Sequence, residues 1–331
     1  MRLNHCLAGT VLSLAAAFAT AQTLTIEGGG AASTTGLVPQ SFAPYAAKAG
    51  YNLQVVLNQV LTKSIMKVGA GKLDLSVAPP PAYLLMERGA GPYASQADTA
   101  KALAKNVRAL FAFQGSTMHP VVWADSGITQ WSDLKDKRIF VGPPAGAANS
   151  QSTGMVESVS NLKADADYEP VKLPWGQATQ SFQDGQYDLY IAFFPIGSQT
   201  ITEMSLQRKI RILSIAPEVF DTPAFKAYEK RAGVSTVAIP PNTYSSIENA
   251  DQTIHAVATA MMVIANASMP DETAYAVTKA YWEALPQMKA SNALLKSQDD
   301  SKPLAGVTAK LHPGAVRYYQ ERGITIPPEL L

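Results

Sequence analysis

The fold is decided by a stretch near the N-terminus, residues 23–37, which reads TLTIEGGGAASTTGL. Residues 23–26 combine β-branched and apolar side chains, which is typical of a short strand. The three glycines at 28–30 then form a loop, and Ser33, Thr34 and Thr35 offer hydroxyl groups that cap a helix, which we expect over residues 37–48. A strand, a loop of small residues and a helix predict the start of a β-α-β series.

The same order continues along the chain in two series of similar size. In the first series we expect strands at 52–57 and 73–77, a helix at 61–68, and a second helix that follows the prolines at 79–81 and runs through residue 86. A polar connection at 89–100 and strands at 107–113 and 119–124, separated by Gly115-Ser116, complete this series. In the second series we expect strands at 137–141, 168–173, 187–194, 210–215 and 234–239, and helices at 149–161, 175–183 and 198–206. Strands that alternate with helices across short loops predict a parallel sheet covered on both faces.

The last part of the chain is helical, with the clearest helices at 271–285 and 313–320. The apolar run 255–265 fits either a strand or a helix, and we interpret it as a strand that returns the chain to the first series. The sequence therefore predicts an α/β protein with one lobe formed by residues 22–117 and 245–331 and a second formed by residues 118–244. Two segments that cross between lobes form a hinge with a cleft beside it.

Length and composition agree with two lobes and exclude several classes of protein. The 331 residues exceed what one hydrophobic core normally organises, and 47% of them are hydrophobic. The 27 Lys and Arg residues are balanced by 26 Asp and Glu, so the chain lacks the basic excess typical of proteins that bind nucleic acid. The single cysteine excludes an internal disulfide bond.

The first 21 residues read as a cleavable signal peptide. Arg2 precedes an apolar run at 7–18, and Ala19-Thr20-Ala21 offers small residues for cleavage after Ala21. An apolar N-terminus that stays part of the fold is the alternative. No later stretch is long enough to span a bilayer, so we expect an exported, periplasmic protein without stable membrane insertion.

A second loop of small residues resembles the first. Residues 142–150, GPPAGAANS, also follow a predicted strand and open a predicted helix. Free backbone N–H groups and the helix dipole make such an end attractive to a carboxylate or another anion. Simple helix capping is the alternative for each loop. One such end in each lobe, at the carboxyl ends of strands, predicts that the cleft grips a small anion from both sides.

The candidate ligand-binding residues come from these loops and from neighbouring segments. They are Ser33, Thr34, Thr35, Lys63, Ser64, Pro80, Ala147, Ala148, Asn149, Ser150, Trp175 and Pro195. The aromatic residues nearest the predicted cleft, which form its wall or pack in the core, are Trp175, Phe193, Phe194 and Tyr83.

Signatures of enzymes are weak or incomplete. Ser33 stands where a dinucleotide-binding loop would carry its third glycine, and the 142–150 loop lacks the Gly-Lys-Ser/Thr ending of a phosphate-binding loop. Residues 64–67 and 132–135 match Ser-x-x-Lys, yet no Lys-Thr-Gly segment or Gly-x-Ser-x-Gly elbow accompanies them. The histidines at 119, 255 and 312 are scattered, and we expect structural roles for them. We therefore expect no catalytic residues, no metal and no cofactor.

Several segments, taken in order, resemble the TAXI family of solute receptors, which serve tripartite ATP-independent periplasmic (TRAP) transporters. The matching segments are GKLDLSV (71–77), HPVVWADSGI (119–128), DLKDKRIFVGPP (133–144), FQDGQYDL (182–189), TKA (278–280) and LHPGAVRYY (311–319).

The resemblance implies a type II periplasmic-binding-protein fold, a ligand held between two lobes, and delivery to an ion-gradient-driven membrane permease. It also implies small organic anions or amino acids, such as glutamate or 2-oxoglutarate, as ligands. The sequence departs from the family's pattern at LNQVLTKS (57–64), at LVP (37–39) and at the proline triplet 79–81, all near the expected ligand, so the resemblance does not carry over the ligand's identity.

Our interpretation is a monomeric solute receptor without catalytic activity. One alternative keeps the fold but serves an ATP-driven importer or a membrane sensor kinase, which neighbouring genes would distinguish. An enzyme on the same two-lobed fold would need a nucleophile and base that the sequence does not offer by spacing. A purely structural envelope protein would show no stabilisation by a ligand.

Overall fold

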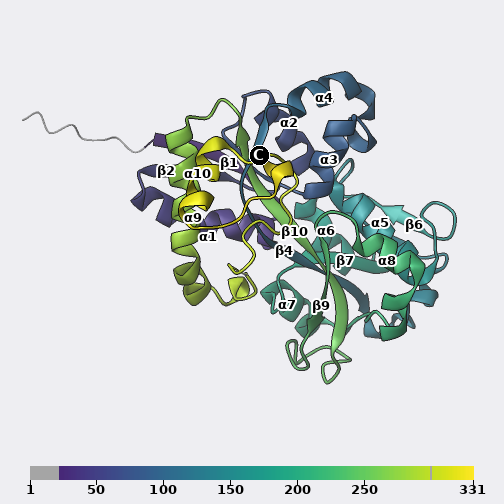
Figure 1. Ribbon diagram of the computed structural model, residues 1–331. Helices are drawn as coiled ribbons and strands as arrows, with labels where there is room; N and C mark the ends of the chain where they lie inside the picture. The colour runs from purple at the N-terminus through teal and green to yellow at the C-terminus, as the bar shows by residue number, and fades with distance from the viewer. Residues whose placement is uncertain (1–21, 299) are drawn as a thin grey trace, which may run out of the picture.

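A computed structural model describes residues 22–298 and 300–331 of the chain, and the predicted signal peptide at 1–21 lies outside these residues. The described residues form a ten-stranded sheet whose path runs β2-β1-β3-β10-β4-β7-β5-β6, with β8 paired to β4 and β9 paired to β10. Figure 1 shows α1, α9 and α10 around one half of the molecule and α5, α6 and α8 around the other, with β10 running through both. The predicted α/β class is confirmed.

The first half contains three short parallel strands joined by helices. They are β1 (Gln22–Glu27), β2 (Tyr51–Val56) and β3 (Leu75–Ala78). The helices that follow them are α1 (Thr34–Lys48), α2 (Leu61–Gly69) and α3 (Pro80–Arg88). Helix α1 begins three residues before the predicted position, and Ser33 is its N-cap residue although its side chain makes no capping hydrogen bond. This half is completed by α9 (Asp271–Ser291) and α10 (Pro313–Glu321).

The second half repeats the alternation of strands and helices. Its strands are β5 (Arg138–Phe140), β6 (Glu169–Val171), β7 (Leu189–Phe194), β8 (Ile210–Ile212) and β9 (Val234–Ile239). Its helices are α5 (Ala147–Ser160), α6 (Trp175–Gln183), α7 (Gln199–Gln207) and α8 (Pro223–Glu229). Strand β5 is parallel to β6 and β7, as the alternation predicted. Helix α8 and, in the first half, α4 (Ala97–Ala104) were not predicted, because helices of seven and eight residues show too few turns for a clear periodic pattern.

Strand β4 (Val107–Trp123) is one strand of 17 residues, so the prediction of two strands separated by Gly115-Ser116 is wrong. Gly115 does not break the strand. It allows β4 to approach β10 (Ile254–Asn266), because a Cβ atom at Gly115 would lie 2.4 Å from the hydroxyl of Thr259. The return strand predicted at 255–265 is confirmed as β10. It pairs antiparallel with β4 on both sides of this point, with a register shift between Ala258 and Ala260.

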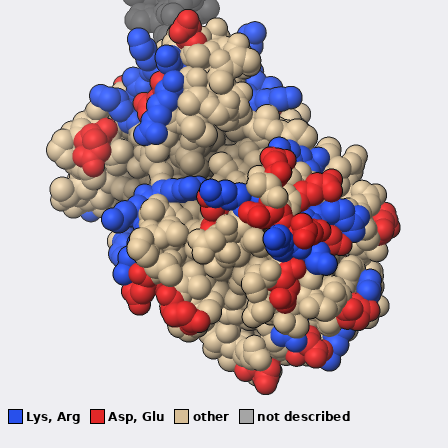
Figure 2. All heavy atoms as spheres, turned by 90° about the vertical axis from the view of Figure 1, so that its right-hand side faces the viewer, with Lys and Arg blue, Asp and Glu red and all other residues tan. Residues whose placement is uncertain are grey.

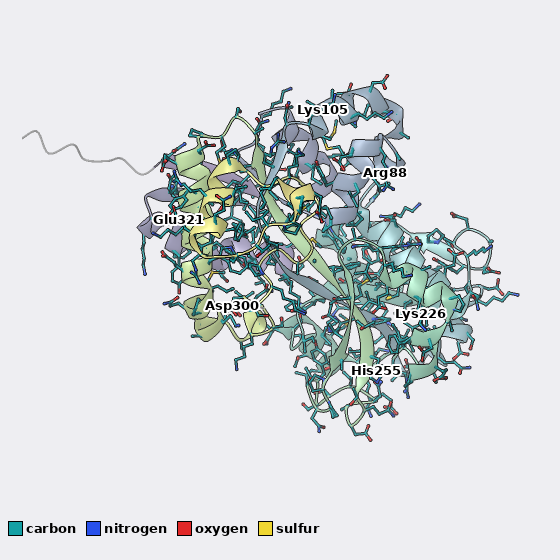
Figure 3. The ribbon with its side chains drawn as sticks, viewed as in Figure 1. Arg88, Lys105, Lys226, His255, Asp300 and Glu321 are labelled. Atoms are coloured by element: carbon teal, nitrogen blue, oxygen red, sulfur yellow. The ribbon has the colours of Figure 1, made fainter. Side chains whose placement is uncertain are left out.

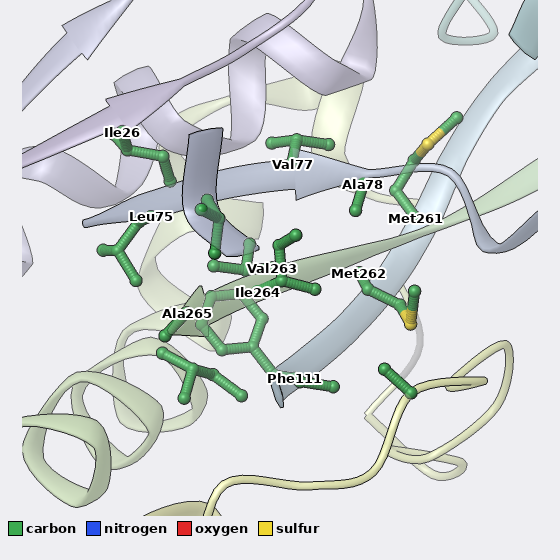
Figure 4. Close-up of a cluster of buried hydrophobic side chains, with 14 of the residues drawn as sticks. Ile26, Leu75, Val77, Ala78, Phe111, Met261, Met262, Val263, Ile264 and Ala265 are labelled. Carbon is green, nitrogen blue, oxygen red and sulfur yellow. The ribbon is translucent and has the colours of Figure 1, made fainter. Parts of the chain in front are cut away.

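The hydrophobic cores divide along these two strands. One cluster contains side chains of β1, β3, α1 and α9 and the parts of β4 and β10 in the first half (Figure 4). There Phe111 of β4 stacks on Tyr281 of α9 with ring centroids 3.8 Å apart. Each buried aromatic side chain of this kind contributes about 1.5–3 kcal/mol.

Two further clusters lie on opposite faces of the sheet in the second half. Alternate residues of β7 enter them, Leu189, Ile191 and Phe193 on one face and Tyr190, Ala192 and Phe194 on the other. Apolar side chains from the segment 247–257 pack in these clusters beside apolar side chains from the segment 118–244. The division into lobes at 117/118 and 244/245 stays a prediction.

Candidate ligand-binding cleft

A cavity of about 60 Å³ lies between the two halves, beside the strands that connect them. Its lining residues come from loops of both halves and from the crossing strands, which contribute Ser116 of β4 and Met261 of β10. On the face shown in Figure 2, a hollow separates the two halves and Lys and Arg side chains lie along its rim. The cavity therefore occupies the position predicted for the cleft.

Five helices begin at the wall of this cavity. The wall includes the N-cap residue or first-turn residues of α1, α2, α3, α5 and α6, which are Ser33, Thr35, Val60, Leu61, Pro79, Gly146, Ala147, Ala148 and Trp175. Each helix start carries a partial positive charge and backbone N–H groups without partners inside the helix. Their convergence favours an anion, or an acceptor-rich group, in the cavity.

The backbone donors at these helix starts differ in availability. The N–H of Thr34 donates to the hydroxyl of Ser116 at 3.0 Å. Within the described part of the chain, the N–H groups of Thr35, Ala147 and Ala148 have no acceptor. A ligand held at these positions would thus receive hydrogen bonds from α1 in one half and from α5 in the other.

The hydroxyl groups of Ser33 and Thr35 are hydrogen-bonded to each other, so neither offers a free donor to the cavity. Ser33 Oγ donates to the carbonyl of Gly30 at 2.6 Å, and the hydroxyls of Ser33 and Thr35 are 2.6 Å apart. Since Ser33 has one hydroxyl proton, Thr35 must donate to Ser33. The oxygen of Thr35 is then left as an acceptor.

Gln151 is a cavity residue that the sequence analysis missed. It lies on α5, four residues after Ala147 and so on the same helix face. Gln151 lines the cavity and is only 5% exposed, and its buried amide nitrogen has no hydrogen-bond partner among the described residues. A buried amide without a hydrogen-bond partner lowers the stability of the folded protein unless a ligand accepts its hydrogen bond.

The rest of the wall is apolar and uncharged. Val60, Leu61, Pro79, Phe193 and Met261 line it, and none of the described Asp, Glu, Lys, Arg or His residues does. An anion in this cavity would be stabilised by amide groups and helix dipoles, without a cationic side chain.

Of the predicted site residues, Ser33, Thr35, Ala147, Ala148 and Trp175 line the cavity. The others lie close by or outside it. Three of them bond to neighbouring groups: Thr34 to Ser116, Asn149 to the carbonyl of Pro143, and Ser150 to the carbonyl of Ala147. Pro80 packs near Gly233, and Lys63 is exposed to solvent. Ser64 is fully buried, and Pro195 is buried away from the cavity. Among the predicted aromatic wall residues, Phe193 lines the cavity and Tyr83 does not.

Ser64 and Lys67, which match Ser-x-x-Lys, both bind the same buried carboxylate. Ser64 Oγ donates to one oxygen of Glu27 at 2.5 Å, and Lys67 Nζ lies 2.6 Å from the other. Glu27 ends β1 and is 6% exposed. The fully buried Ser64 hydroxyl therefore fastens α2 to β1 and is not accessible to a substrate.

The histidines at 119, 255 and 312 lie apart from the cavity. His119 is fully buried, with one ring nitrogen 3.0 Å from the carbonyl of Thr117 and the other 2.9 Å from the hydroxyl of Tyr244. Burial lowers the pKa of His119 to about 4, so the ring is neutral near pH 7. His312 accepts from the N–H of Gly314 at the start of α10, and His255 lies at the far end of the second half (Figure 3).

Within residues 22–298 and 300–331, no helix has the length and apolar character needed to cross a membrane. In the same residues, no group of three or more His, Cys, Asp and Glu side chains is arranged to hold a metal ion.

Comparison with solved structures shows the fold. The chain is similar to the alkanesulfonate-binding protein SsuA from Xanthomonas axonopodis pv. citri bound to MOPS, with a TM-score of 0.52 and 13% identity over 93% of this chain and 81% of that one. It is also similar to a protein from Bordetella bronchiseptica RB50, with a TM-score of 0.50 and 16% identity over 93% and 84% of the two chains. The predicted two-lobed type II periplasmic-binding-protein fold is confirmed.

A sequence-family comparison covers most of the chain. The model of the NMT1-like family matches residues 44–323, which include both crossing strands and the α5 side of the cavity. The chain therefore belongs to the NMT1-like family.

Proposed function

We propose that this protein is an exported solute receptor that captures a small organic anion, a carboxylate, between its two lobes. The observation that carries the proposal is Gln151, whose buried amide nitrogen lacks a partner at a cavity where five helices begin. An anionic oxygen placed there would accept from this amide and from the unpartnered N–H groups of Thr35 and Ala148.

Capture works by a shift between open and closed arrangements of the lobes. The ligand contacts both α1 and α5, so it binds the closed arrangement more tightly than the open one and raises its population. The crossing strands support this motion, because Ser116 lies in β4, lines the cavity and bonds to Thr34 at the start of α1. The receptor role needs no catalytic group, and the inaccessible Ser64 agrees with a binding protein rather than an acylating enzyme.

The partner in this proposal is a TRAP-type membrane permease driven by an ion gradient. Its support is the resemblance of residues 71–77, 119–128 and 133–144 to the TAXI receptors. An ATP-driven importer or a sensor kinase is the alternative partner on the same fold. Proteoliposomes that hold the candidate permease distinguish the transporters, because uptake by an ion-coupled permease requires a sodium or proton gradient and proceeds without ATP.

The first experiment is a thermal-unfolding screen of residues 22–331 against carboxylates, keto acids, amino acids and sulfonates. Sulfonates are included because the similar protein from Xanthomonas axonopodis binds them. A ligand at about 100 times its Kd adds about 2.7 kcal/mol to the free energy of unfolding, which raises the melting temperature clearly. Mass spectrometry of small molecules released on denaturation detects a ligand that copurifies. No stabilisation by any compound and no released ligand would contradict the receptor role.

A further inference from the structure

A second compartment adjoins the cavity. We call this second compartment the vestibule and the cavity described above the inner cavity. The vestibule has a volume of about 230 Å³, and both compartments are lined by Ser33, Trp175 and Phe193. Tyr190 and Phe194 also line the vestibule, together with the polar residues Asn58, Thr179 and Thr200 and with small residues that include Gly176. A ligand longer than a few atoms would therefore extend from the inner cavity past Trp175 and Phe193 into the vestibule.

The vestibule has aromatic walls. Trp175 and Phe193 meet edge to face with ring centroids 5.6 Å apart, and Tyr190 meets Phe194 in the same way at 6.3 Å. Aromatic walls favour planar apolar groups, which can stack on a ring or contact its edge. The volume is sufficient, because an apolar cavity of about 150 Å³ can hold a benzene molecule.

Neither compartment has a carboxylate to face an ammonium group. Among the described residues, no Asp or Glu lines either of them. The buried carboxylate of Glu27 lies outside both linings, and its oxygens are bound by Ser64 and Lys67. An α-amino group in the inner cavity would be a buried cation without a counter-charge, which is strongly unfavourable.

The proline triplet makes one side of the inner cavity free of donors. Helix α3 begins with Pro80 and Pro81, which have no N–H, and the N–H of Ala82 is bonded to the carbonyl of Pro79. Among the five helix starts, α3 therefore offers no free N–H from its first turn, while Pro79, Leu61 and Met261 present apolar side chains to the cavity. This arrangement suits a ligand with one anionic end.

We propose that the ligand is a monocarboxylate with a planar apolar group and no amino group. The carboxylate lies in the inner cavity beside Gln151, and the apolar group lies in the vestibule between Trp175 and Phe194. This proposal rests on the proposed function and differs from the glutamate or 2-oxoglutarate that the TAXI resemblance implies.

Isothermal titration calorimetry with four matched acids tests the ligand class. 3-Phenylpropanoate has the carboxylate and the ring, phenylalanine adds an amino group, propanoate lacks the ring, and glutamate has an amino group and a second carboxylate. We expect 3-phenylpropanoate to bind at least about tenfold more tightly than each of the other three, since only it places apolar area in the vestibule without a buried ammonium.

Each other result has a distinct meaning. Tighter or equal binding of phenylalanine, propanoate or glutamate overturns the proposed ligand class and leaves the receptor function standing. Absence of 3-phenylpropanoate binding overturns the class as well. The receptor function itself fails only if the broader screen also finds no ligand.

A substitution at Gly176 tests where the ring lies. A Cβ atom at Gly176 would meet no atom within 4 Å, so a larger side chain can enter the vestibule without a clash. Gly176→Leu should weaken binding of 3-phenylpropanoate by about tenfold or more and change binding of propanoate little. Gln177→Leu, at the next position of α6, is the matched control; it is exposed, lines neither compartment, and should bind both acids as the parent does. If Gly176→Leu weakens both acids equally, or neither, the placement of the ring in the vestibule is wrong.

Discussion

The hydroxyl of Thr62 donates a hydrogen bond of 3.0 Å to the backbone carbonyl of Ala145, which lies 83 residues further along the chain. Thr62 belongs to the first turn of α2 in one half, and Ala145 belongs to the loop before α5 in the other. Ala145 has a φ of 57°, in the left-handed region that residues other than glycine rarely adopt. A hydrogen bond therefore joins the two halves directly at the cleft.

Thr62→Val should favour the open arrangement of the lobes. Valine keeps the shape of the side chain and removes the hydroxyl, so only the bond to Ala145 is lost. A hydrogen bond contributes about 0.5–1.5 kcal/mol, which corresponds to a two- to tenfold weaker ligand affinity. Calorimetry measures the affinity, and small-angle X-ray scattering measures the larger radius of the free protein.

Thr278→Val is the matched control for this prediction. Its hydroxyl is also buried and donates to a carbonyl, that of Ala274, but within α9 and away from the cleft. This variant should lose stability without changing ligand affinity. Equal affinity losses in both variants would show that the bond between Thr62 and Ala145 has no special role in closure.

Gln151→Met should stabilise the ligand-free protein and weaken ligand binding. Methionine has nearly the shape of glutamine and no donor, so the free protein no longer buries an unpartnered amide. We expect the free energy of unfolding without ligand to rise by about 1 kcal/mol and the ligand affinity to fall at least about tenfold. Urea unfolding and calorimetry measure the two quantities. The exposed Gln177→Met should change neither, and a destabilised Gln151→Met would contradict a ligand-binding role for the amide.

Gly115→Ala should destabilise the crossing of β4 and β10. The added Cβ would lie 2.4 Å from the hydroxyl and 3.0 Å from the carbonyl oxygen of Thr259, so the strands must move apart. Overpacking of this kind costs about 1–3 kcal/mol, which thermal unfolding detects. Gly176→Ala, whose Cβ meets open space, provides the comparison and should be neutral. A neutral Gly115→Ala would mean that the strands tolerate separation at this point.

Acid should destabilise the protein through His119. The pKa of this histidine is about 4 in the folded protein, because of burial, and 6.5 when unperturbed. Between these values the unfolded state binds more protons, so stability is lost as the pH falls from about 6.5 towards 4, by roughly 3 kcal/mol in total. Urea unfolding at about pH 7 and about pH 4.5 measures the change. His119→Gln should lose less stability over this interval than the parent.

The order of strands and helices was predictable from sequence because each element has its own local signal. The apolar run 107–113 marks a strand, but the run 255–265 fits a strand or a helix, and periodicity could not show that β4 continues through Gly115. That continuity depends on pairing with β10, a contact between residues far apart in the chain. Long-range packing, rather than local preference, decided this part of the fold.

The candidate site was predictable only where a loop of small or hydroxyl-bearing residues indicates the start of a helix. Ser33, Thr35, Ala147 and Ala148 were found in this way, and the structure brings them to one cavity. Gln151 was missed, because a glutamine within a helix normally faces water and only the folded protein shows that this one is buried. The reverse holds for Lys63, whose charge suggested a ligand contact but which faces solvent.

The pairing of β4 with β10 also determines what another protein can sense. Because β4 and β10, which connect the halves, are adjacent strands of one sheet, the closure that we propose would bend both strands at one place. A small displacement near Ser116 would then grow with distance from that place. A protein that grips the outer edges of both halves can therefore read occupancy as one distance, without touching the ligand.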